Sequence, residues 1–219
     1  MSKLFLLGDS TCAIKEECAR PETGWGECFS QYLSDGFELV NMAKNGRSTE
    51  MIIHEGIFFD CFSQVTSGDW VIIQFGHNEN KPEIYRRTYP QTTYKLNLKW
   101  FIDNFKKKGV NVVLISSIAR RRFENGICVN THESYPEAMK DIADSEGVTF
   151  IEMSERTREY FNKVGEEESL KYFMNFGPGI YPNYPNGKED NTHLRPEGAE
   201  LIANMIYNAC KEKKLEFVK

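Results

Sequence analysis

The sequence has no long apolar run. No stretch reaches the ~18 consecutive apolar residues that a membrane-spanning helix needs. At the N-terminus, the apolar stretch from Leu4 to Leu7 meets Gly8 and Asp9 before it is long enough for the core of a signal peptide. We therefore expect no contact with a membrane, no export signal and a cytoplasmic location.

Paired cysteines and clustered histidines are also lacking. The six cysteines are scattered without a C-x-x-C pair, and a chain of 219 residues can build a core without disulfides, so we expect free thiols in a reducing compartment. The four histidines show no metal-ligand spacing such as H-x-x-x-H. We expect neither a metal site nor an organic cofactor.

The chain has no excess of positive charge. Its net charge of -5 predicts no general attraction to nucleic acid or to anionic membranes. Apolar residues make up 40% of the chain and charged residues 27%, which is typical of a globular protein. No repeat, low-complexity segment or linker divides the sequence, so we expect one domain over residues 1–219. The oligomeric state stays open, with a homodimer as one alternative.

Short apolar runs alternate with amphipathic stretches, which is typical of an α/β fold with a mainly parallel sheet. The five expected strands span Lys3–Leu7, Phe37–Met42, Trp70–Phe75, Val110–Ser116 and Val148–Ile151. The expected helices span Trp25–Leu33, Ser48–Phe62, Thr92–Lys107, Tyr135–Ser145, Ser154–Val164 and Pro196–Lys213. The stretch Phe173–Thr192, rich in Tyr, Pro, Gly and Asn, is expected to be irregular. These elements predict a three-layer α/β/α sandwich.

Polar residues follow the first two expected strands, and ligands of such sheets gather at the carboxyl ends of the strands. The Ser10 hydroxyl, in Gly-Asp-Ser-Thr, is a candidate nucleophile; alternatively, Asp9 or Ser10 caps the following segment. Gly46 can offer its backbone N–H to a ligand at close range, or it forms a plain Asn-Gly turn.

Two further polar segments follow the third strand and precede the last helix. The amide of Asn78 can donate a hydrogen bond to a developing oxyanion, or it can form a turn. Asp190 lies three residues before His193, so that its carboxylate can hold the imidazole as the base that a serine nucleophile needs. The alternative is a capping aspartate beside a surface histidine.

Taken in this order, the four segments resemble the four sequence blocks of the SGNH (GDSL-type) hydrolase superfamily. The resemblance implies a flavodoxin-like fold and a triad of Ser10, Asp190 and His193. It also implies an oxyanion hole formed by the N–H groups of Ser10 and Gly46 and the side chain of Asn78. Glu79 departs from the family pattern, in which an aspartate is common at this place.

Within the superfamily, the segments GDST, GRST, QFGHN, ARRRFENG and THESYPEAM resemble bacterial rhamnogalacturonan acetylesterases. This resemblance implies a serine esterase that removes acetyl groups from a pectin backbone in which rhamnose alternates with galacturonic acid. Its partner is then an acetylated, anionic oligosaccharide. Arg120, Arg121 and Arg122 are expected to meet the galacturonate carboxylates, unless they form a solvated basic turn.

Aromatic side chains are candidates for stacking on sugar faces, with packing in the core as the alternative. They are Trp25, Tyr172, Tyr181 and Tyr184.

Other functions remain open from the sequence. The same scaffold can serve a xylan or other sugar O-acetylesterase, a lysophospholipase, a thioesterase or a sugar-binding relative without catalysis. A flavodoxin-like nucleotide binder is disfavoured, because no glycine-rich phosphate loop follows the first strand. The absence of a visible export signal implies short imported oligosaccharides as substrates.

Overall fold

Five parallel strands form the central sheet of the computed structural model, which describes residues 1–219. The strands lie in the order β2-β1-β3-β4-β7. Their bounds are β1 Ser2–Gly8, β2 Phe37–Asn41, β3 Trp70–Gln74, β4 Asn111–Ile115 and β7 Thr149–Ile151. The five strands predicted from the sequence are therefore confirmed.

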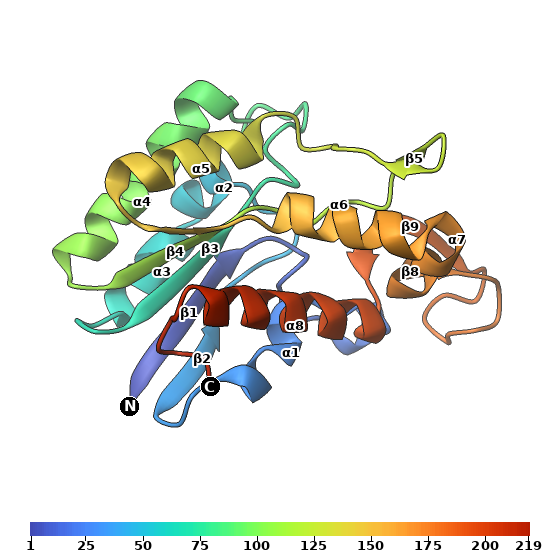
Figure 1. Cartoon of the computed structure of the whole chain (residues 1–219), viewed down its shortest axis with the longest axis horizontal. Helices are drawn as coiled ribbons and strands as arrows, with labels where there is room; N and C mark the ends of the chain where they lie inside the picture. Colours follow the sequence, from blue (N-terminus) through green and yellow to red (C-terminus); the bar gives the residue numbers. More distant parts are fainter.

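Helices cover both faces of the sheet, so the predicted three-layer architecture is confirmed (Figure 1). One face carries α2 Thr49–His54, α3 Ile57–Gln64, α4 Lys95–Lys107 and α5 Tyr135–Glu146. The other face carries α1 Trp25–Cys28, α6 Met153–Val164 and α8 Pro196–Glu212. The short helix α7, Glu166–Ser169, follows α6, and a single π-helical turn, Pro90–Tyr94, leads into α4.

Successive side chains of each strand point to opposite faces of the sheet, so a hydrophobic core forms on each face. In β1, Leu4 and Leu6 pack under α1 and α8, whereas Phe5 and Leu7 pack under α3 and α4. Since both faces of a parallel sheet are buried, the strand is almost continuously apolar. This burial fixes the carboxyl end of β1, where the first candidate residue follows.

Two of the predicted helices are shorter or divided in the structure. The stretch Ser48–Phe62 forms α2 and α3, because Gly56 adopts φ 78° and interrupts the helix. The stretch Trp25–Leu33 forms only α1 and a 3₁₀ turn at Ser30–Tyr32, because Leu33 turns into an extended conformation and pairs with Val218.

The prediction that Phe173–Thr192 is irregular is wrong at both ends of that stretch. Strand β8, Phe173–Phe176, pairs antiparallel with β9, Lys188–Leu194, in a two-stranded sheet outside the main one. The amide Nδ2 of Asn175 supports the pairing with a 2.9 Å hydrogen bond to the carbonyl of Asp190. The polar sequence of β9 lacks the alternation that predicts a strand, and so the pairing escapes sequence analysis.

A second small hairpin joins β5, Phe123–Glu124, to β6, Ile127–Cys128. Its two turn residues, Asn125 and Gly126, adopt φ values of 51° and 78°. An Asn-Gly pair with positive φ at both residues is typical of a tight hairpin turn.

None of the helices combines the length and the apolar character that crossing a bilayer requires. All six cysteines are free thiols in the structure.

Candidate active site

Ser10 lies in the turn directly after β1. A side chain at Gly8 would place its Cβ 2.3 Å from Cys12 Sγ and 2.9 Å from the carbonyl of Gln74, so only glycine fits there. Asp9 Oδ1 accepts hydrogen bonds from the backbone N–H of Thr11 at 2.9 Å and from its hydroxyl at 2.8 Å. Asp9 therefore shapes the turn on which the Ser10 hydroxyl stands.

His193 and Asp190 meet Ser10 from the distant end of the chain. His193 Nε2 lies 2.9 Å from Ser10 Oγ, and His193 Nδ1 lies 2.7 Å from Asp190 Oδ2. Because the carboxylate accepts the proton on Nδ1, Nε2 is left as an acceptor for the serine proton. The side chains of His193 and Asp190 are 29% and 18% exposed, so a substrate can reach the imidazole.

An irregularity in the β8–β9 pairing aims His193 at the serine. Phe173 pairs with Leu194, but the next residue, Met174, pairs with Asp190, so three residues of β9 have no partner in the ladder. These residues are Asn191, Thr192 and His193. Such bulges re-aim side chains in many active sites.

The contact between His193 and Asp190 shifts the pKa values of both side chains. Burial alone would lower the pKa of His193, but the hydrogen bond and the charge of Asp190 outweigh burial and raise it above its ordinary value. Burial acts to raise the pKa of Asp190, yet contacts with His193 and two backbone N–H groups hold it well below its usual range. Asp190 is therefore ionised at neutral pH.

The two further candidates for the oxyanion hole, Gly46 and Asn78, lie on loops that contact each other. Gly46 adopts φ 76°, a conformation that favours glycine. Asn78 is 7% exposed, and its Nδ2 donates a 3.1 Å hydrogen bond to the carbonyl of Arg47, the neighbour of Gly46. The contact leaves the second N–H of the amide free to donate.

Lys15 connects the serine turn to the Gly46 loop. Its side chain is fully buried, and Nζ donates to the carbonyl of Ser10 at 2.5 Å and to Asn45 Oδ1 at 2.6 Å. Glu22 Oε1, 2.7 Å away, balances the charge. Sequence analysis missed Lys15, because no spacing marks a long side chain that folds back on its own loop.

His77, the chain neighbour of Asn78, forms a buried pair with His132. His132 Nε2 lies 3.0 Å from His77 Nδ1. Burial lowers the pKa of His132 to about 3 and that of His77 well below its ordinary value, so both imidazoles are neutral. No set of three or more His, Cys, Asp or Glu side chains converges on one point in the structure.

The three predicted arginines line one cavity of about 460 Å³ together with Asn80, Lys81 and Asn191. Arg120 donates to the carbonyls of Thr131 and His77, and Arg121 donates to Asn191 Oδ1 and to the carbonyl of Glu166. Arg122 is the exposed member, with Nε 3.5 Å from Glu124. Arg120 and Arg121 thus build the wall, and Arg122 keeps most of its donors free.

Of the two alternatives for Trp25, the structure supports packing in the core and not stacking on sugar. Trp25 is fully buried, and its Nε1 donates a 2.8 Å hydrogen bond to Gln74 Oε1 beneath the serine turn. Tyr172 and Tyr184 are partly buried, with their hydroxyls bonded to Tyr160 and to the carbonyl of Ala19, and Tyr181 packs on Phe176. Stacking of these three tyrosines on sugar stays a prediction.

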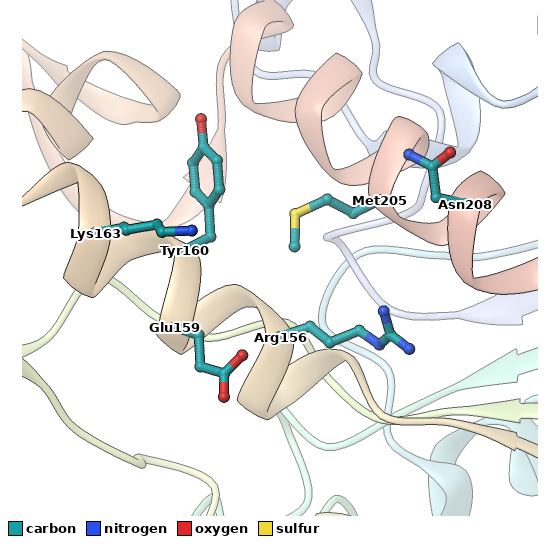
Figure 2. Close-up of a pocket in the computed structure, with 6 residues that line it drawn as sticks. All are labelled: Arg156, Glu159, Tyr160, Lys163, Met205 and Asn208. Carbon is teal, nitrogen blue, oxygen red and sulfur yellow. The ribbon is translucent and has the colours of Figure 1, made fainter. Parts of the chain in front are cut away.

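Another cavity lies away from these residues, between α6 and α8. It measures about 520 Å³ and is lined by Arg156, Glu159, Tyr160, Lys163, Met205 and Asn208, as Figure 2 shows. None of the four sequence segments contributes to it. The Arg156 guanidinium is already paired with Glu212, and no Ser, Cys or His side chain lines this cavity.

The chain is similar in sequence to named proteins of Bacillus subtilis (strain 168). Rhamnogalacturonan acetylesterase RhgT of Bacillus subtilis (strain 168) is 39% identical over 211 residues, which cover 96% of this chain and 90% of that protein. The probable rhamnogalacturonan acetylesterase YesY of the same organism is 34% identical over 212 residues, covering 95% and 92%.

Solved structures share the fold. A protein from Bacillus subtilis superposes with a TM-score of 0.84 at 21% identity, over 99% of this chain and 58% of that longer one. An acetylxylan esterase from Geobacillus stearothermophilus superposes with a TM-score of 0.65 at 18% identity, over 100% and 96% of the two chains. The sequence profile of the GDSL-like lipase/acylhydrolase family matches residues 6–201. The chain therefore belongs to the GDSL-like lipase/acylhydrolase family, as the four sequence blocks predict.

Proposed function

We propose that the protein is a serine esterase that removes O-acetyl groups from pectic oligosaccharides of the rhamnogalacturonan type. The observation that carries the proposal is the unbroken line of hydrogen bonds from Ser10 Oγ through His193 to Asp190, at 2.9 and 2.7 Å. The substrate class is supported by the two relatives named for rhamnogalacturonan, at 39% and 34% identity.

In the proposed reaction, His193 Nε2 takes the proton of Ser10 as its oxygen attacks the acetyl carbonyl. Donors from Ser10 N–H, Gly46 N–H and the Asn78 amide stabilise the oxyanion. An acetyl-enzyme forms, and His193 then protonates the departing sugar alcohol. It next activates a water molecule that releases acetate. Asp190 keeps the imidazole in the required tautomer, and the steps need no metal or organic cofactor.

The proposal extends to the surroundings of the site. The cavity lined by Arg120, Arg121 and Arg122 would receive a uronate unit of the chain, chiefly through the exposed Arg122. The protein would act as one domain on short oligosaccharides in the cytoplasm, where its six free cysteines would stay reduced.

A different sugar acetylesterase is the second candidate, because an acetylxylan esterase shares the fold. We expect faster acetate release from acetylated rhamnogalacturonan fragments than from acetylated xylan. A preference for xylan would contradict the pectic substrate and leave the esterase mechanism standing.

Replacing the nucleophile tests the mechanism itself. We expect Ser10→Ala to lower acetate release and turnover of 4-nitrophenyl acetate by at least about 10³-fold, because no other group can form the acetyl-enzyme. Ser63→Ala, on the exposed surface of α3, is the control and should keep wild-type rates. Normal turnover by a folded Ser10→Ala protein would rule out the assignment.

A further inference from the structure

Arg86 lies beside the Gly46 loop, in the connection between β3 and α4. A Cβ built on Gly46 would have Arg86 Nη2 as its nearest neighbour, at 3.9 Å. The guanidinium thus lies next to the glycine whose N–H is proposed to meet the oxyanion. Arg86 was not among the residues that sequence analysis selected.

The guanidinium of Arg86 makes no hydrogen bond or ion pair within the protein, and its one charge contact is with the ring of Tyr85, whose centre lies 6.0 Å from Cζ. Most other arginines either pair with a carboxylate, as Arg47 does with Glu55, or donate to protein oxygen atoms, as Arg120 does, and the exception, Arg87, is exposed. Arg86 does neither, and its Nε is buried without a hydrogen-bond acceptor. A buried donor that meets no acceptor is unfavourable unless a ligand satisfies it.

The backbone holds Arg86 at this place. The N–H of Arg86 donates to the carbonyl of Glu83 at 3.0 Å, and the N–H of Thr88 donates to the carbonyl of Glu79 at 2.9 Å. The Thr88 hydroxyl also donates to Glu79 Oε2 at 2.5 Å. These bonds order the backbone of the loop from which the Arg86 side chain reaches Gly46.

The neighbouring Arg87 provides a contrast. It is exposed, and its guanidinium lies 5.7 Å from the centre of the Tyr89 ring. Its charge acts on Tyr135, at the N-terminal end of α5. The two arginines thus share a loop and a charge but point to different surroundings.

We propose that Arg86 binds the carboxylate of the uronic acid unit that lies at the reacting centre, and so selects anionic over neutral acetyl esters. The planar fork of a guanidinium fits a carboxylate, and partial burial strengthens the pairing. The inference rests on the proposed function, since it assumes that an acetylated sugar chain occupies the Ser10 site. It places an anion contact at the Gly46 loop, in addition to the cavity around Arg122.

The test compares two substrates that differ in one charge. An acetylated galacturonate monosaccharide is offered as the free acid and as its methyl ester, and kcat/KM for acetate release is measured for each. The wild type should favour the free acid by about 10- to 100-fold, the range of a hydrogen bond to a charged group. This preference should weaken at high salt.

In Arg86→Gln the ratio of acid to ester should fall toward one, mainly through a higher KM for the free acid. Arg86→Lys should keep part of the preference, because the charge remains without the fork, and it serves if Arg86→Gln fails to fold. Arg87→Gln is the matched control and should keep the wild-type ratio.

The outcomes separate the two proposals. Equal rates of the wild type on acid and ester, or an unchanged ratio in a folded Arg86→Gln protein, would overturn the role of Arg86 and leave the proposed function intact. Turnover of 4-nitrophenyl acetate without acetate release from either galacturonate substrate or from acetylated rhamnogalacturonan would overturn both the role of Arg86 and the pectic substrate.

Discussion

At the scale of single residues, opposing effects set the pKa of the His193 imidazole. Burial lowers its pKa, whereas Asp190 and the nearby Glu22 raise it, and Lys15 works against them. The net pKa lies above the ordinary 6.5. Since only the neutral imidazole can accept the serine proton, kcat/KM should rise with pH through this raised pKa and then level off.

Replacing Asp190 by asparagine should change both the height and the position of that profile. We expect the plateau to fall by about 10³- to 10⁴-fold, because the amide no longer holds the active tautomer. With the carboxylate gone, burial is opposed only by Glu22, so the rise in kcat/KM should move to lower pH. A pH profile of Asp190→Asn with an unmoved midpoint would contradict the assignment.

Sequence analysis finds some residues of the site and misses others for a physical reason. Ser10, Asn78 and His193 lie beside strand ends or before a helix, where position along the chain predicts position in space. Lys15 and Arg86 act through long side chains whose direction depends on the packing of loops. No sequence spacing encodes that direction, so these residues emerge only from the structure.

At the scale of elements, Glu79 joins three segments behind the site. Its carboxylate accepts from the backbone N–H of Thr49 at the start of α2, from the Thr49 hydroxyl and from the Thr88 hydroxyl. Complete burial is the main reason why its pKa rises to about 7. The longer side chain, in place of the family's aspartate, thus connects the end of β3 to α2 and to the Arg86 loop.

This junction predicts a pH dependence of stability. Because the folded state holds the Glu79 proton more tightly than the unfolded state, its contribution to the free energy of unfolding is largest below pH 4.5 and falls as pH rises to about 7. The loss amounts to at most about 3 kcal/mol. Urea titrations across this window should show a flatter pH dependence for Glu79→Gln than for the wild type. Glu83→Gln removes an exposed carboxylate of the same loop and should behave as the wild type. Parallel curves for the wild type and Glu79→Gln would disprove the prediction.

The elements themselves were predictable to unequal degrees. The strands of the main sheet can be predicted from their apolar runs, because both faces of the sheet are buried. The division between α2 and α3 depends on the conformation of Gly56, and glycine tolerates both a helix and a turn. The β8–β9 pair depends on contacts across a long connection, which local patterns do not report.

At the scale of the whole molecule, the proposed triad is divided between two sheets. Ser10 follows a central strand of the five-stranded sheet, whereas Asp190 and His193 lie on the two-stranded one. An isolated pair of strands has little stability of its own. The pair is attached to the rest of the protein by contacts such as the 2.8 Å hydrogen bond from Arg121 N–H to the Asn191 carbonyl.

We therefore expect activity to disappear before the fold does. In a urea titration, turnover of 4-nitrophenyl acetate should fall at lower urea than far-UV circular dichroism, because local opening needs less free energy than global unfolding. Fluorescence of the buried Trp25 region should follow the circular dichroism. Coincident curves for activity and both structural signals would show that the two sheets unfold together.

The bulge in β9 has a consequence for such an inactivated form. Asp190 and His193 belong to the same strand, so a displacement of the β8–β9 pair would move both residues together. Only the distance from His193 to Ser10 Oγ would then increase. In the displaced β8–β9 pair, His193 would keep its contact with the Asp190 carboxylate and therefore its raised pKa. Imidazole resonances of His193 that keep a raised pKa after turnover has ceased would be the NMR signature of this intermediate.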